Sequence, residues 1–164
     1  SFMIITTVIS VLSVLQLAID GVFKLFGFEN FNLLEKPLAI SKIYKNLHPN
    51  ARVIGPNPAY PTHSSFEASH SDAPHITYQL DPHNGWEPDL DEIERKVRKN
   101  ENIAGILIVN PDNPTGFVYA QDTIRKIVDI AKKYNLFIIS DEIYSNLFFP
   151  NSGMKKLASV IGDV

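Results

Sequence analysis

The feature that most constrains the fold is a nearly continuous apolar run at residues 103–109, which reads IAGILIV. Such a run is typical of a strand that is buried on both faces of a parallel sheet, because neither face meets water. A second run, LFII, follows at residues 136–139, and between the two runs apolar residues recur at helical spacing from Ile124 to Ala131. Strand, helix and strand in this order predict a βαβ unit. We therefore expect an α/β fold, a mostly parallel sheet with helices on both faces.

Shorter elements are predicted on the N-terminal side of this unit. Residues 52–54 and 76–80 are predicted to be strands, the second because apolar and polar residues alternate in it. A helix with small residues is expected at residues 62–70. The charged run at residues 89–99 is predicted to be a solvated helix face, and the spacing of its first acidic residues resembles a capping box. Prolines 56, 58 and 61 are expected to interrupt regular structure.

Composition narrows the class of protein but does not reveal its function. A chain of 164 residues has the length of one domain, and 45% hydrophobic with 20% charged residues is ordinary for a globular protein. The net charge of -3 argues against a nucleic-acid partner, which would favour a basic face. Because the sequence has no cysteine, disulfides, cysteine zinc sites and thiolate nucleophiles are excluded.

The N-terminal segment differs in character from the rest. No charged residue occurs from Phe2 to Ile19. Three interpretations are open: a buried or amphipathic helix, a membrane or export segment, or a truncation or gene-model artefact. Residues 20–37 then form a connector. We expect two parts, an atypical apolar segment and connector at 1–37 and a domain at 38–164.

Polar motifs follow three of the predicted strands. They read GPNPAYP at residues 55–61, NPDNPTG at 110–116 and SDEIY at 140–144. In open parallel sheets, ligands bind beyond the carboxyl ends of the strands. Each motif alone has a structural explanation as a turn, a helix cap or loop packing. Their occurrence in this order, at three strand ends, indicates a binding site.

From about residue 38 to its end the chain resembles the large domain of class I/II aminotransferases, the fold-type-I enzymes that depend on pyridoxal phosphate (PLP). NPDNPTG and DEIY carry this resemblance, and the distance between them accommodates one helix and one strand. The resemblance implies PLP as cofactor and transfer of an amino group from an amino acid to a 2-oxo acid. It further implies that the parent enzyme is a homodimer, and the absence of cysteine fits a cytoplasmic enzyme.

The resemblance also implies which residues hold the cofactor. Asp141 would keep the pyridine nitrogen protonated, and Asn113 and Tyr144 would donate hydrogen bonds to the anionic 3-oxygen. Tyr60 would stack on the face of the ring. The bond between Asn113 and Pro114 is often cis in this family. Thr115 and Gly116 are expected to shape the turn.

Two functional groups of the family have no counterpart in this sequence. The lysine that forms a Schiff base with PLP lies beyond the DEIY motif in the family, and Lys155 and Lys156 come too early for that role. The arginine that binds the substrate carboxylate belongs to the family's C-terminal domain. We therefore expect no catalytic lysine in this chain, which by itself would be an inactive fragment.

The expected phosphate site also departs from the family pattern. A loop rich in Gly or Ser normally precedes the first helix, here predicted at residues 40–47, and its amides hold the phosphate. At that place this sequence reads EKPL, residues 35–38. Proline has no amide hydrogen and Glu35 would repel a phosphate group.

Two alternatives remain open for the function. A PLP-dependent lyase or synthase of the same fold would use the same ring-binding residues. A non-catalytic remnant would bind PLP weakly, a partner, or nothing. A metal site is not expected, because the histidines at positions 63, 70, 75 and 83 are predicted to be surface or loop residues.

Overall fold

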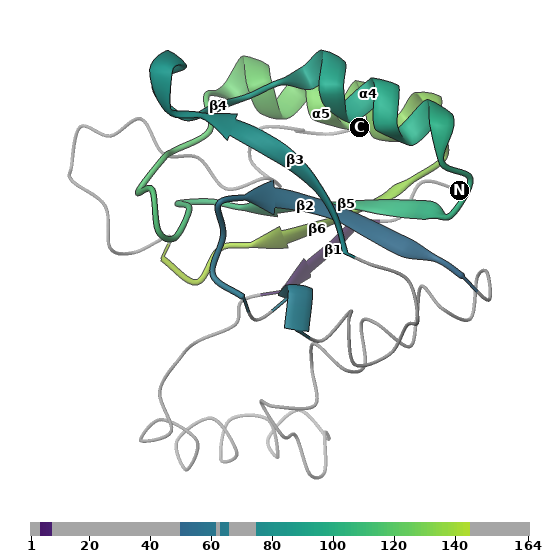
Figure 1. Cartoon of the computed structure of the whole chain (residues 1–164), viewed down its shortest axis with the longest axis horizontal. Coiled ribbons are helices and arrows are strands. Elements are labelled where there is room, and N and C mark those ends of the chain that lie inside the picture. Colours follow the sequence, from purple (N-terminus) through teal and green to yellow (C-terminus); the bar gives the residue numbers. More distant parts are fainter. Residues whose placement is uncertain (1–3, 8–49, 62, 66–74, 145–164) are drawn as a thin grey trace, which may run out of the picture.

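The computed structural model describes residues 4–7, 50–61, 63–65 and 75–144. Its sheet has the strand order β1-β6-β5-β2-β3-β4 (Figure 1). The strands are β1 (Ile4–Thr7), β2 (Arg52–Asn57), β3 (Ile76–Asp81), β4 (Glu87–Pro88), β5 (Ile103–Val109) and β6 (Phe137–Asp141). All neighbours run parallel except β3 and β4. The predicted α/β class and mostly parallel sheet are confirmed.

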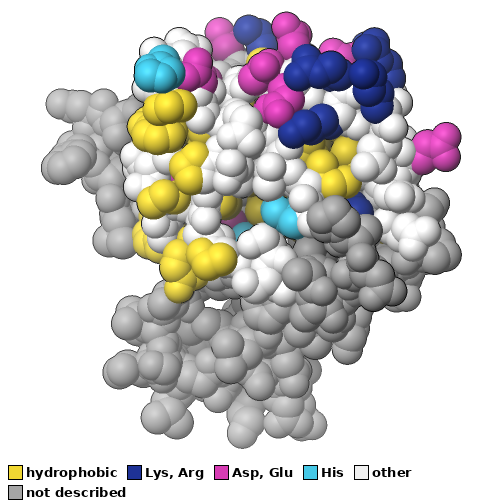
Figure 2. Space-filling model, viewed as in Figure 1, with side chains coloured by type: hydrophobic (Ala, Val, Ile, Leu, Met, Phe, Trp, Pro, Cys, Tyr) yellow, Lys and Arg dark blue, Asp and Glu magenta, His cyan; other side chains and the backbone are white. Residues whose placement is uncertain are grey.

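Two helices, α4 (Leu90–Lys99) and α5 (Gln121–Lys133), lie together along the sheet (Figure 1). A short 3-10 helix, η1 (Pro82–Asn84), precedes β4. The apolar stripes of α4 and α5, with Ile93, Ile124 and Ile127 at their centres, pack against Ile106 and other strand residues in the main core. Lys, Arg, Asp and Glu side chains gather over the helices on the visible surface, as amphipathic helices require (Figure 2).

A second apolar cluster lies on the other face of the sheet. It contains Leu107, Val109 and Ile139, whereas Ile106 and Ile138 belong to the cluster under the helices. Neighbouring residues of one strand thus enter different cores, since successive side chains point to opposite faces. This burial on both faces explains why residues 103–109 form a continuous apolar run rather than an alternating one.

Gly105 marks a close contact inside this sheet. It is paired with Phe137 of β6, and a Cβ at this position would lie 2.7 Å from two ring carbons of Phe137. No side chain fits beside that ring without moving it. The glycine within the apolar run is therefore explained by close approach of an aromatic neighbour.

Strand β2 continues past the point where proline was expected to end it. It runs to Asn57, and Pro56 is paired with Tyr78 of β3. On its other side β2 pairs with β5 only as far as Ile54. A proline beyond the end of that ladder removes no hydrogen bond from it. The prediction that Pro56 interrupts regular structure is wrong for this physical reason.

The apolar N-terminal segment contributes a strand. Residues Ile4–Thr7 form β1, parallel to β6, with Ile4 opposite Ile138 and Thr7 opposite Asp141. For these four residues the helical interpretation is wrong, and their β-branched side chains favour the strand. The rest of 1–37, the helix expected at 40–47 and most of the helix expected at 62–70 lie outside the described residues; 63–65 are helical. Within the described part of the chain, no helix has the length and apolarity needed to span a membrane.

Candidate functional site

The sheet register brings two of the three polar motifs together. Val109, the last residue of β5, lies opposite Asp141, the last residue of β6. The next residue, Asn110, donates its backbone N–H to the carbonyl oxygen of Asp141 at 2.8 Å. The NPDNPTG turn therefore begins directly beside the DEIY motif, because the carboxyl ends of parallel strands share one edge of the sheet.

The NPDNPTG turn is held by its own polar side chains. The carboxylate of Asp112 accepts a hydrogen bond from Thr115 Oγ1 at 2.5 Å, and Asn110 Oδ1 accepts one from the N–H of Tyr119 at 3.1 Å. Gly116 has a φ of 71°, which glycine adopts at little cost. Thr115 and Gly116 thus shape the turn, as the sequence predicted, and the bond between Asn113 and Pro114 is cis.

Asp141 presents a carboxylate at the end of β6. The residue is 8% exposed. Its Oδ1 accepts the backbone N–H of Ile143 at 3.1 Å, and its Oδ2 lies 3.1 Å from Nε2 of His63. A carboxylate has about four lone-pair sites, so two such contacts leave it able to accept a further hydrogen bond. Asp141 can therefore bind one more donor.

Asn113 and Tyr144 meet across the ends of the two strands. The amide Nδ2 of Asn113 donates to the phenol oxygen of Tyr144 at 2.9 Å, although the residues are 31 positions apart. The amide nitrogen carries a second hydrogen and the phenol retains its own. Both groups can therefore donate to a third, anionic oxygen placed between them.

Tyr60 is tied by its backbone to the same turn. Its N–H donates to the carbonyl oxygen of Asn113 at 2.8 Å, which joins the loop after β2 to the loop after β5. The residue is 58% exposed, whereas the other large hydrophobic residues in the described part of the chain are buried or partly buried. An exposed aromatic ring anchored by its backbone is available to stack on a flat ligand.

The contact between His63 and Asp141 was not anticipated from the sequence. His63 was expected to be a surface or loop histidine, but its side chain is only 16% exposed and reaches a carboxylate 78 positions away. The available signal was its place three residues after Tyr60, just beyond the GPNPAYP motif. A local sequence pattern does not show which distant carboxylate a histidine meets.

Several predicted features lie outside the described residues. They are Lys155, Lys156, His70 and the EKPL stretch at residues 35–38. Among the residues that the structure describes, no three His, Asp or Glu side chains are grouped in a way that could hold a metal ion.

Comparison with known proteins shows which family this chain matches. The family model for aminotransferases of class I and II matches residues 39–163. An uncharacterised aminotransferase of Methanocaldococcus jannaschii is 52% identical over 126 residues, which cover 77% of this chain and 29% of that protein. An S-alkyl-thiohydroximate lyase of Arabidopsis thaliana is 34% identical over 126 residues, covering 74% of this chain and 27% of the lyase.

Solved structures show the same relation. The crystal structure of an aminotransferase from Escherichia coli aligns with a TM-score of 0.64 and 28% identity, covering 93% of this chain and 39% of that one. The chain thus spans less than a third of the length of the curated relatives named above.

Proposed function

Since this chain belongs to the class I and II aminotransferase family, we propose that it is the ring-binding part of a PLP-dependent enzyme that transfers an amino group from an amino acid to a 2-oxo acid. One observation carries the proposal: Asp141, Asn113 and Tyr144 converge at the carboxyl ends of β5 and β6. PLP is the cofactor of this family, and when bound it supplies an electron sink for the substrate's α-carbon.

The carboxylate of Asp141 suits the pyridine nitrogen of this cofactor. A negative charge within hydrogen-bond distance favours the protonated form of a ring nitrogen. The backbone N–H of Ile143 and the side chain of His63 hold the carboxylate at a fixed orientation while leaving it lone pairs. We propose that Asp141 binds the ring nitrogen and that His63 positions Asp141.

The pair of Asn113 and Tyr144 suits the cofactor's 3-oxygen. Each retains a hydrogen after the 2.9 Å bond between them, so the pair offers two donors to one anionic oxygen. Tyr60, anchored to the carbonyl of Asn113, supplies the exposed ring for stacking. The four residues thus bind different parts of one heterocycle.

A lyase of the same fold is the alternative that a specific observation supports. At 34% identity the plant lyase is as similar to this chain as curated aminotransferases that are 32% identical to it, and the ring-binding residues would serve either reaction. The family match favours the aminotransferase. In the full enzyme the two activities separate by product, since a carbon-sulfur lyase releases a thiol, ammonia and a 2-oxo acid from one substrate while an aminotransferase needs an oxo-acid acceptor.

The parent enzyme is also proposed to be a cytoplasmic homodimer. Sedimentation of the full enzyme and fractionation of cells would measure these two properties. Neither affects the proposal for the ring site, which depends only on residues within the chain.

The test of the proposed function is PLP binding to the purified chain, measured by visible absorption. We expect saturable binding that Asp141→Ala weakens by about tenfold or more, because a hydrogen bond to a charged group is lost. Asp129→Ala, which removes an exposed carboxylate on α5, is the matched control and should bind PLP like the wild type. Equal affinity in wild type and Asp141→Ala would contradict the proposal. Borohydride reduction with intact-mass analysis would detect any lysine that bonds to PLP.

A further inference from the structure

The outer edge of β3 is a second feature with a functional consequence. On one side β3 pairs with β2 from Ile76 to Gln79. On its other side β4 pairs only with Leu80 and Asp81. Successive residues of a strand direct their backbone N–H and C=O groups to opposite edges. Those of Thr77 and Gln79 point to this outer edge. An open strand edge of this kind can pair with another chain.

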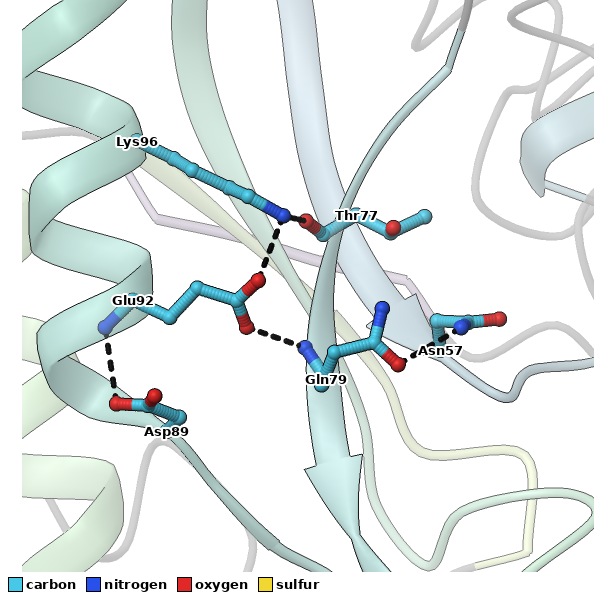
Figure 3. Close-up of polar contacts among 6 residues, drawn as sticks. All are labelled: Asn57, Thr77, Gln79, Asp89, Glu92 and Lys96. Atoms are coloured by element: carbon cyan, nitrogen blue, oxygen red, sulfur yellow. Dashed lines mark hydrogen bonds and ion pairs between the residues drawn. The ribbon is translucent and has the colours of Figure 1, made fainter.

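Residues of the first turns of α4 occupy that edge (Figure 3). The N–H of Gln79 donates to Glu92 Oε2 at 2.7 Å, and the carbonyl oxygen of Gln79 accepts the N–H of Asp89 at 3.3 Å. The carbonyl oxygen of Thr77 accepts a hydrogen bond from Nζ of Lys96 at 2.6 Å. Two side chains and one backbone amide thus take the places that a neighbouring strand would fill.

Glu92 and Lys96 act as a pair. They are one helical turn apart, and Nζ of Lys96 lies 2.7 Å from Oε1 of Glu92 (Figure 3). The side chain of Glu92 is only 12% exposed, so both of its carboxylate oxygens are committed to these contacts. Charge-assisted hydrogen bonds are stronger than those between neutral groups. The predicted solvated face of α4 is therefore wrong for Glu92, whereas the side chain of Lys96 stays 36% exposed.

The local geometry of Asp89 makes this arrangement possible. A complete capping box would direct the Glu92 carboxylate back to the N–H of Asp89. Here Asp89 Oδ1 still accepts the N–H of Glu92 at 2.9 Å, but the N–H of Asp89 is bonded to Gln79. The carboxylate of Glu92 is thereby free to reach the strand.

We propose that Glu92 and Lys96 close the β3 edge against pairing with a second copy of this chain. The most direct partner for an uncovered β3 is another β3, since two identical edges can pair antiparallel about a twofold axis. Asn57 Nδ2 donates to Gln79 Oε1 at 2.9 Å, which holds the strand to β2 on its inner side and leaves only the outer side to be covered. This inference does not depend on the proposed enzymatic function.

The test compares self-association of Glu92→Ala/Lys96→Ala with that of the wild-type protein. Sedimentation velocity over a range of concentrations gives the association constant, and hydrogen exchange reports on the amide of Gln79. We expect association to tighten by about tenfold or more, with the Gln79 amide protected in the associated species. Asp91→Ala/Lys99→Ala is the matched control, because it removes one acid and one base from exposed positions of the same helix. The control should associate like the wild type.

A folded double variant that associates like the wild type would overturn the proposal. Tighter association in which the Gln79 amide exchanges freely would overturn it too, because another surface would then be responsible. If circular dichroism shows that the double variant does not fold, the self-association of Lys96→Met is measured in its place. It removes the donor to Thr77 and keeps the aliphatic stem, so we expect a smaller increase in association, and no increase would refute the edge closure.

Discussion

At the scale of single residues, Asp112 is an acid in a place that solvates its charge poorly. The side chain is buried, and Oδ1 has no hydrogen-bond partner among the described residues. Oδ2 accepts from the hydroxyl and the N–H of Thr115. Burial raises the pKa of Asp112, and the hydrogen bonds from Thr115 offset only part of that rise. The oxygens of Asp112 thus serve the turn as hydrogen-bond acceptors, although the charge of the buried carboxylate is poorly solvated.

This raised pKa makes a prediction about stability and pH. An acid whose pKa is higher in the folded than in the unfolded state binds protons better when folded, so its contribution is most favourable at low pH. The loss of folding stability that the charged carboxylate causes begins as pH rises through the ordinary Asp pKa of about 3.9, and it is complete above the pKa of the folded state. We expect the free energy of unfolding of Asp112→Asn, relative to wild type, to be greater at neutral pH than near pH 3.5. Urea unfolding at both values measures it, and a difference that is independent of pH would contradict the assignment.

At the scale of elements, α4 begins at an N-cap that also faces the sheet. Asp89 Oδ1 accepts the N–H of Glu92, one of the four amides that a helix start leaves unpaired. Acidic residues occupy the first turn and basic residues the last, which suits the helix dipole. Because α4 covers the edge of β3, the stability of the helix start and the closure of the edge are linked.

We expect Asp89→Ala to lower the free energy of unfolding by about 1 kcal/mol, the usual cost of losing an N-cap side chain. Asp89→Asn keeps an oxygen acceptor and should lose far less. Both variants keep the backbone amide that binds Gln79. Urea unfolding of the three proteins measures the difference. Equal losses in the Ala and Asn variants would show that the charge of Asp89, rather than its capping oxygen, stabilises the helix.

At the scale of the whole molecule, Tyr78 joins three segments that are distant in sequence. Its hydroxyl, on β3, donates to the carbonyl oxygen of Leu107 on β5 at 2.9 Å. Tyr119, just before α5, lies with its hydroxyl 3.0 Å from that of Tyr78 and must be the donor, because Tyr78 has only one hydrogen. Burial raises the pKa of both phenols, so both stay protonated. These hydrogen bonds link β3 to β5 beneath the helices, although β2 lies between the two strands in the sheet.

This order of donors predicts unequal effects for two similar substitutions. Tyr78→Phe leaves the buried carbonyl of Leu107 without its donor and Tyr119 without its acceptor, so we expect a loss of about 1–3 kcal/mol in the free energy of unfolding. Tyr119→Phe keeps the bond to Leu107 and should cost less. Urea unfolding of both variants is the measurement. A larger loss in Tyr119→Phe would refute the order of donors.

The sequence by itself determined the class of the fold and predicted most of the residues that we propose as the ring site. The apolar runs at residues 103–109 and 136–139 predicted buried parallel strands, because a strand that is buried on both faces is apolar at nearly every position. Residues 113, 141 and 144 could be placed in one site because parallel strands end at one edge of the sheet. The roles of these residues toward the cofactor remain predictions.

Only the tertiary structure decided which distant residues meet. His63 reaches Asp141 across 78 positions, and Glu92 reaches the backbone of Gln79 instead of its own helix start. The continuation of β2 through Pro56 depends on where its ladder with β5 ends. A sequence pattern records how each segment is buried along its own axis. It does not record the register and side-by-side order of segments, and these set the contacts between them.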